Sequence, residues 1–269
     1  MATFTDDQTL LSQYIEKIQR FRLLDDTFFN SCFQDNKEGL ELLLRIIKQR
    51  PDLHVIKIIN QKDVPNIYGR EVCFDIFAED SAGEVYEFEI QRSDRGAVPK
   101  RARYNSSMLD AVAVNKNTKW QDIPKSCVIM ITENDVLGGC KPIYHIRRTV
   151  EELDNQDFGD ESEIIYVNAS YEADDALGRL MHDFHCINPD DMYYPELAER
   201  ARFFKTNEKG VRQMCKIMQE IRMEGRSEGE DRMGRLVEKL VSSGHNDDVA
   251  RVAVDREYRT EMYKKYNIE

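Results

Sequence analysis

Residues 71–91 read EVCFDIFAEDSAGEVYEFEIQ, and apolar and polar residues alternate along both halves of this segment. The two halves are separated by Asp80-Ser81-Ala82-Gly83, a cluster that favours turns. The pattern therefore predicts two neighbouring strands joined by a tight turn. Because successive side chains of a strand point to opposite faces, Asp75 interrupts an apolar face of the first strand, whereas Glu89 and Gln91 share a face of the second.

If the two strands pair, the carboxylates of Asp75 and Glu89 and the amide of Gln91 can converge on one cation. Mg²⁺ suits such a set, because it prefers hard oxygen ligands, usually one or two carboxylates with waters and a substrate phosphate. This arrangement is typical of a metal-dependent phosphodiesterase. By the pattern alone, the commoner interpretation is an amphipathic hairpin whose carboxylate face is simply solvated.

These three residues and several other segments of the chain resemble the sequence pattern of one known family. Asp75 followed by Glu89-Ile90-Gln91 is similar to the D…(D/E)xK signature, with Gln in place of Lys. The other segments are LDDTFF at 24–29, LLLRII at 42–47, FEIQRSD at 88–94 and KRARYNSSMLD at 100–110, with YVNASY, LGRLMHDF and MCKIMQEIR later in the chain. Together they resemble the PD-(D/E)XK nuclease family transposases, a branch related to the recombination-promoting nucleases, over roughly residues 23–225.

The resemblance implies an α/β (α+β) fold with a restriction-endonuclease-like αβββαβ core, a mixed sheet and a helical C-terminal region. It implies a DNA endonuclease that hydrolyses phosphodiester bonds with Mg²⁺ or Mn²⁺ and is connected with mobile elements, recombination or defence. Asp75, Glu89 and Gln91 would be catalytic. Asp75, Glu89 and the backbone carbonyl of Ile90 would bind the metal.

The superfamily usually adds an acidic group from its first helix. Glu41 is the preferred candidate for this ligand and Glu38 is the second, although a solvated helix face explains both equally well. Asp26 precedes an aromatic pair at a predicted helix start, where an acid complements the helix dipole. We therefore expect a capping role for Asp26, with an approach to the metal as the less favoured alternative.

The net charge of −12 is unusual for a protein that binds nucleic acid, so a local basic patch would have to attract the phosphates. Such a patch follows the predicted site directly. Arg101 and Tyr104 fall at helical spacing, so Arg101 can bind a phosphate oxygen with support from Tyr104; a surface Arg and a core-rim Tyr explain the spacing as well. The candidate DNA-binding residues are Arg92, Arg95, Lys100, Arg101, Arg103 and Tyr104.

Gln91 departs from the superfamily's Lys and weakens the predicted chemistry. A neutral amide can orient a water by hydrogen bonding, whereas an ammonium can also stabilise negative charge. Two other classes therefore stay open. The chain could be a catalytically inactive nuclease-fold protein that binds nucleic acid, or an interaction module that serves protein assembly.

The predicted organisation is an N-terminal extension at 1–22, a nuclease core at 23–172 and a helical region at 173–269, with a candidate homodimer contact from about residue 210. The sequence shows no membrane-spanning run and no signal-peptide pattern, so a cytoplasmic protein is expected. The six cysteines form no CxxC pair, and His182 and His185 lack a HExxH pattern, which argues against a zinc site.

Periodicity places the remaining elements. Besides residues 71–91, strands are expected at 54–60, 126–132, 142–149 and 163–168, with a turn at Asn66-Ile67-Tyr68-Gly69. Helices are expected at 36–49, 97–114, 210–241, 246–253 and 255–266, and from residue 173 onward.

Overall fold

The computed structural model describes residues 4–65 and 70–268, so the predicted turn at Asn66-Ile67-Tyr68-Gly69 lies outside the described residues. By its internal contacts the chain divides into two units, Met1–Val211 and Arg212–Glu269. Each unit has its own packed interior. None of the helices described is both long and apolar enough to cross a membrane.

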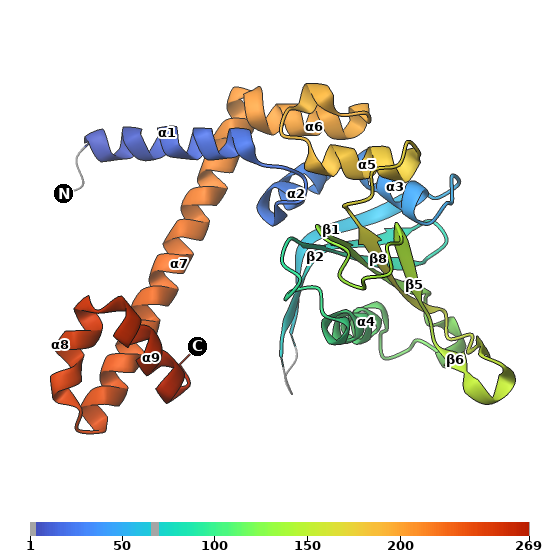
Figure 1. Ribbon diagram of the computed structural model, residues 1–269. Coiled ribbons are helices and arrows are strands. Elements are labelled where there is room, and N and C mark those ends of the chain that lie inside the picture. Colours follow the sequence, from blue (N-terminus) through green and yellow to red (C-terminus); the bar gives the residue numbers. More distant parts are fainter. Residues whose placement is uncertain (1–3, 66–69, 269) are drawn as a thin grey trace. The chain divides into compact units, whose positions relative to one another are not determined.

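A mixed six-stranded sheet, with strand order β1-β2-β3-β4-β8-β5, forms the centre of the first unit (Figure 1). β2 runs antiparallel to both of its neighbours, β1 and β3. β3, β4 and β8 run parallel to one another, and β5 returns antiparallel to β8. A short pair, β6 (Thr149–Val150) and β7 (Gln156–Asp157), stands apart. The strands of the large sheet are β1 (Val55–Val64), β2 (Val72–Asp80), β3 (Val85–Gln91), β4 (Ser126–Thr132), β5 (Ile143–Ile146) and β8 (Ser162–Asn168).

The turn between β2 and β3 follows from its sequence. The Asp80 carboxylate accepts the backbone N–H groups of Ala82 and Glu84, each at 2.9 Å, and Gly83 adopts φ +81°. This geometry suits a short acidic residue followed by glycine, because glycine reaches positive φ without steric cost. In β4, every residue of SCVIMIT is buried, as expected for a central parallel strand covered on both faces.

Helices cover both faces of the sheet (Figure 1). α4 (Pro99–Ala113), which connects β3 to β4, lies on one face, and α2 (Asp26–Phe33) and α3 (Lys37–Ile47) lie on the other. α5 (Ala176–His185) and α6 (Pro195–Thr206) pack against these two helices, and α1 (Phe4–Arg20) packs against α6. The expected α/β fold with a mixed sheet and a helical C-terminal region is confirmed.

The second unit is helical. α7 (Glu208–Ser242) continues through the three glycines that lower helix propensity near its middle, and α8 (Asn246–Val254) and α9 (Arg256–Tyr266) follow it. Leu236, Leu240, Val252 and Met262 form the core of this unit. The sequence placed a boundary after residue 172, but the contacts keep α5 and α6 with the sheet and divide the chain at 211/212. The difference arises because the apolar faces of α5 and α6 are buried against α2 and α3.

Candidate active site

The carboxylates of Asp75 and Glu89 meet where β2 and β3 separate. The backbone ladder between these strands ends at the pair Ile76 and Phe88. Beyond that pair, Asp75 Oδ2 accepts the backbone N–H of Ile90 at 3.1 Å, so a side chain takes over the position of a ladder bond. β2 stays with β1 while β3 stays with β4 to its end, so the two strands diverge and both carboxylates lie at the point of divergence.

The backbone of Ile90 is oriented toward the same place. In a strand, the N–H and C=O of one residue face the same neighbouring strand. Since the Ile90 N–H points to Asp75, the Ile90 carbonyl lies on the side of β3 that faces Asp75. The next residue, Gln91, faces β4 instead, because its carbonyl accepts the N–H of Glu133 at 3.0 Å. A carbonyl oxygen is thus available beside the carboxylates.

A third carboxylate comes from Asp26, at the first turn of α2. Its side chain shares a hydrogen bond with Asp75 and accepts Nδ2 of Asn30 at 2.7 Å. The sequence indicated a cap at this position, but the residue at the N-cap of α2 is Asp25. The packing of α2 across β2 and β3 brings Asp26 to the site.

The three acids oppose one another electrostatically. Burial, followed by the charges of Glu89 and Asp26, raises the pKa of Asp75 to about 8. Burial also raises the pKa values of Asp26 and Glu89, and the Arg101 guanidinium counteracts the shift in each case. A divalent cation would relieve this repulsion. The donor set of three carboxylates and one carbonyl consists of hard oxygens, which is the set that Mg²⁺ and Mn²⁺ prefer.

Glu89 is held by three side chains. Its Oε1 accepts Nη2 of Arg101 and, at 2.6 Å, Nε2 of Gln91, while Oε2 lies 3.5 Å from Nδ2 of Asn105. Asn105 also donates to Oε1 of Glu87, at 3.2 Å. The carboxylate of Glu89 therefore has a fixed orientation, and Glu89 as a whole is only 2% exposed.

Glu87 and Gly96 support this arrangement, and neither was among the site residues predicted from the sequence. Glu87 is fully buried beside Glu89, and burial raises its pKa well above the ordinary value. Gly96 lies against Gln91: a Cβ at Gly96 would come within 1.7 Å of Oε1 of Gln91. For Gly96 the only sequence signal was the glycine itself, because its contact with Gln91 depends on how the loop after β3 folds back.

The structure does not bring Glu41 to this cluster. Glu41 Oε1 accepts the N–H of Val55 at 2.9 Å, and Oε2 accepts Arg45 at 2.8 Å. Val55 pairs with Asp80, five residues along β2 from Asp75. At about 3.3 Å per residue, the position of Val55 lies roughly 16 Å along the sheet from that of Asp75. Glu41 instead links α3 to β1. The helical acid that reaches Asp75 is Asp26, at the start of α2. The second candidate, Glu38, is exposed on α3.

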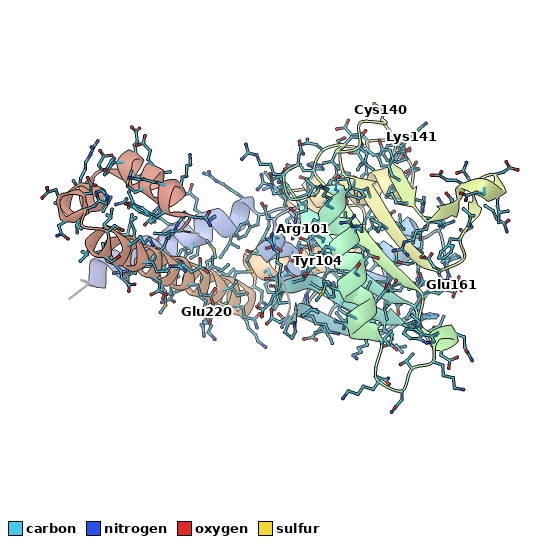
Figure 2. All side chains as sticks on the ribbon, turned by 90° about the horizontal axis from the view of Figure 1, so that it is seen from below. Arg101, Tyr104, Cys140, Lys141, Glu161 and Glu220 are labelled. Atoms are coloured by element: carbon cyan, nitrogen blue, oxygen red, sulfur yellow. The ribbon has the colours of Figure 1, made fainter. Side chains whose placement is uncertain are left out.

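The predicted DNA-binding residues fall into two groups. Arg92 is held by Asp25 at 2.5 Å and by Glu133 at 3.2 Å, and Arg101 is held by Glu89. Figure 2 shows Arg101 and Tyr104 on the same side of α4; the Tyr104 hydroxyl donates to the carbonyl of Arg70 at 2.5 Å. The exposed group, which forms no salt bridge with the residues described, comprises Arg95, Lys100 and Arg103.

Comparisons with known proteins identify one family. A family model described as PD-(D/E)XK nuclease family transposase matches residues 26–173, more than half of the chain. The matched segment begins at Asp26 and includes Asp75, Glu89 and all of α4. No curated protein and no solved structure matches the chain.

Proposed function

This chain belongs to the PD-(D/E)XK nuclease family transposases, and we propose that it is a metal-dependent endonuclease that hydrolyses phosphodiester bonds of DNA. The observation that carries the proposal is the convergence of Asp26, Asp75 and Glu89 from three different elements, with pKa values raised by burial. Nucleases of this family type generally use divalent metals, and the all-oxygen donor set favours Mg²⁺ or Mn²⁺. The site residues are Asp75, Glu89, the Ile90 carbonyl and Asp26.

When bound, such a cation would polarise a phosphoryl oxygen and make a nucleophile available at neutral pH. The chain's own groups supply position and charge. Gln91 and Asn105 orient the Glu89 carboxylate. The Arg101 side chain, 41% exposed, can transfer from Glu89 to an oxygen of an approaching phosphate, since guanidinium groups pair well with either anion. Gln91 has no proton to give at neutral pH, so protonation of the leaving oxygen falls to solvent.

The exposed group Arg95, Lys100 and Arg103 supports DNA as the substrate, because these cations lie on and just before α4, beside the site. These three cations offset the charge of the three acids locally, although the whole chain has a net charge of −12. A role in mobile elements, recombination or defence follows from the family and is part of the proposal.

The proposal is tested by nicking of supercoiled plasmid in Mg²⁺, Mn²⁺ or EDTA. We expect metal-dependent nicking that Asp75→Asn, Glu89→Gln and Asp26→Asn each reduce to background, because each removes a carboxylate ligand. Glu38→Gln, on the exposed face of α3, is the matched control and should retain activity. The proposed nuclease activity would be refuted if the wild-type protein left supercoiled, linear and single-stranded DNA intact in both Mg²⁺ and Mn²⁺.

The second candidate is a catalytically inactive nuclease-fold protein that binds nucleic acid. The ion pair between Arg101 and Glu89 favours it, because the guanidinium already neutralises a proposed metal ligand. DNA binding by a fluorescence anisotropy assay, together with no cleavage by wild type or by Arg101→Gln, would select this candidate.

We also propose a homodimer contact through the C-terminal helices. Ile221, Met223 and Val254 are exposed apolar side chains in that unit, with exposures of 48%, 64% and 85%. Light scattering should give twice the chain mass for the full-length protein, and a monomeric mass at micromolar concentration would contradict the proposal.

A further inference from the structure

A second cluster of metal-ligating side chains lies at the end of α5. His182, Asp183 and Cys186 each offer one ligand atom, and these atoms all lie within 4.8 Å of one another. His182 Nδ1 is 3.3 Å from Oδ1 of Asp183 and 3.4 Å from Sγ of Cys186. The cluster shares no residue with the carboxylate site described above.

These separations match the edges of a tetrahedral zinc site. With Zn–N and Zn–O bonds near 2.1 Å and a Zn–S bond near 2.3 Å, neighbouring ligand atoms lie roughly 3.4–3.6 Å apart. Two of the three edges already have about this length. The spacing also explains why the sequence gave no signal, because one residue is adjacent to His182 and the other is one helical turn away, outside the CxxC and HExxH patterns.

The ligands are held by surrounding groups, as metal ligands usually are. Asp183 is fully buried, and its two oxygens accept the backbone N–H groups of Tyr193 and Tyr194 at 2.8 and 2.9 Å. The His182 ring stands edge-on to the Tyr193 ring, with centroids 4.8 Å apart. His182 and Cys186 are partly exposed, so their side chains are accessible to an ion from solvent.

We propose that His182, Asp183 and Cys186 form a binding site for Zn²⁺ or a similar transition-metal ion. A mixed nitrogen, oxygen and sulfur set selects such an ion over Mg²⁺, which prefers oxygen alone. His182 and Tyr193 also line a pocket of about 670 Å³, so the fourth coordination position can take water or a small ligand from that pocket. Binding transfers the thiol proton of Cys186 to solvent, so occupancy rises with pH.

The first experiment measures binding of the metal alone to the full-length protein, after treatment with EDTA and dialysis. We expect one equivalent of Zn²⁺ in protein that carries Asp75→Asn and Glu89→Gln, which disable the carboxylate site, and Co²⁺ should give a thiolate-to-metal charge-transfer band. Cys186→Ser should abolish that band, and His182→Asn should weaken Zn²⁺ binding by at least about 10-fold. The control is His185→Asn: His185 lines the same pocket, but its Nε2 donates to the carbonyl of Ala169 at 3.1 Å.

A second experiment uses thiol alkylation followed by mass spectrometry, with a control inside the same molecule. Zn²⁺ should protect Cys186 from alkylation while exposed Cys140 (Figure 2) remains reactive. Absence of protection at Cys186, or one equivalent of Zn²⁺ retained in both Cys186→Ser and His182→Asn, would overturn the proposal. Because Zn²⁺ binding is measured with Asp75→Asn and Glu89→Gln in place, this result is independent of whether the protein cleaves DNA.

Discussion

At the scale of single residues, the orientation of Glu89 depends on the neighbouring side chains that hold its carboxylate. Gln91 donates to Glu89, and the far side of the Gln91 side chain lies against Gly96. Asn105 links Glu89 to Glu87. Small displacements in this group matter, because a misplacement of about 1 Å can cost on the order of 100-fold in rate.

Gly96→Ala is therefore expected to reduce DNA cleavage by about 10- to 100-fold. The added Cβ would overlap Oε1 of Gln91 and push the amide away from Glu89. The folded state should be little affected, since Gln91 can swing outward. Initial nicking rates and thermal denaturation measure the two effects. Gly229→Ala, where a Cβ meets nothing within 4 Å, is the control, and equal rates for Gly96→Ala and wild type would show that Gln91 does not position Glu89.

Asp75→Asn is expected to stabilise the metal-free protein at pH 8. Burial and the neighbouring acids raise the folded-state pKa of Asp75 to about 8 from 3.8. The folded state therefore binds more protons than the unfolded state between these values, and stability falls as pH rises through that window. One pKa unit corresponds to about 1.4 kcal/mol, so the variant should gain at least this much at pH 8.

The measurement is urea denaturation of both proteins in EDTA at pH 4, 6 and 8. The difference between Asp75→Asn and wild type should shrink toward pH 4, where Asp75 is protonated in the folded state. Asparagine keeps an oxygen to accept the Ile90 N–H, so that contact is retained. A difference that does not change with pH would mean that ionisation of Asp75 carries no cost in the folded protein.

At the scale of elements, Lys205 joins three segments of the first unit. It lies on α6, is only 3% exposed, and its Nζ donates to the backbone carbonyls of Gln19 at 3.1 Å, Phe21 at 2.6 Å and Ile187. These carbonyls follow or end α1 and α5, where the last helical carbonyls lack intrahelical partners. The N-terminal segment is therefore fixed to the helical layer above the sheet.

Lys205→Met is expected to lower the free energy of unfolding of the first unit by about 2 kcal/mol, because it leaves three partly buried carbonyls without their donor. Methionine retains most of the side-chain volume, so a cavity contributes little. Denaturant titration with a probe in the first unit gives the value. Lys209→Met, at a nearby exposed position, should change stability by less than about 0.5 kcal/mol, and similar losses in both variants would argue against the role of the buried ammonium.

At the scale of the whole molecule, the two units have separate cores. Leu44 is fully buried in the first unit and Leu240 in the second. Truncation of a fully buried leucine usually costs about 2–5 kcal/mol. Because few contacts cross a boundary between domains, each unit can unfold by itself.

We expect Leu240→Ala to reduce hydrogen-exchange protection only in α7 beyond residue 212, α8 and α9. Leu44→Ala should reduce protection in the sheet and in α2 and α3, and leave the second unit unchanged. Exchange monitored by mass spectrometry at increasing urea distinguishes the two. Equal loss of protection throughout the chain in either variant would show one cooperative unit instead of two.

The local features of this protein follow from patterns in its sequence. Alternation along residues 71–91 predicted β2 and β3, the apolar run at 126–132 predicted β4, and the acidic-aromatic segment predicted the start of α2. These predictions succeed because strand and helix periodicity reflects which face of an element is buried. The family resemblance, confirmed over residues 26–173, added the expected order of the elements.

Which of these residues meet depends on how the elements pack together. Glu41 and Asp26 are both acids near the start of predicted helices, and periodicity gives no means to choose between them. The packing of α2 across β2 and β3 brings Asp26 to Asp75, whereas α3 places Glu41 beside Val55. Contacts between distant segments, such as Lys205 with the end of α1, depend on how elements pack, and no periodic pattern within one segment encodes that packing.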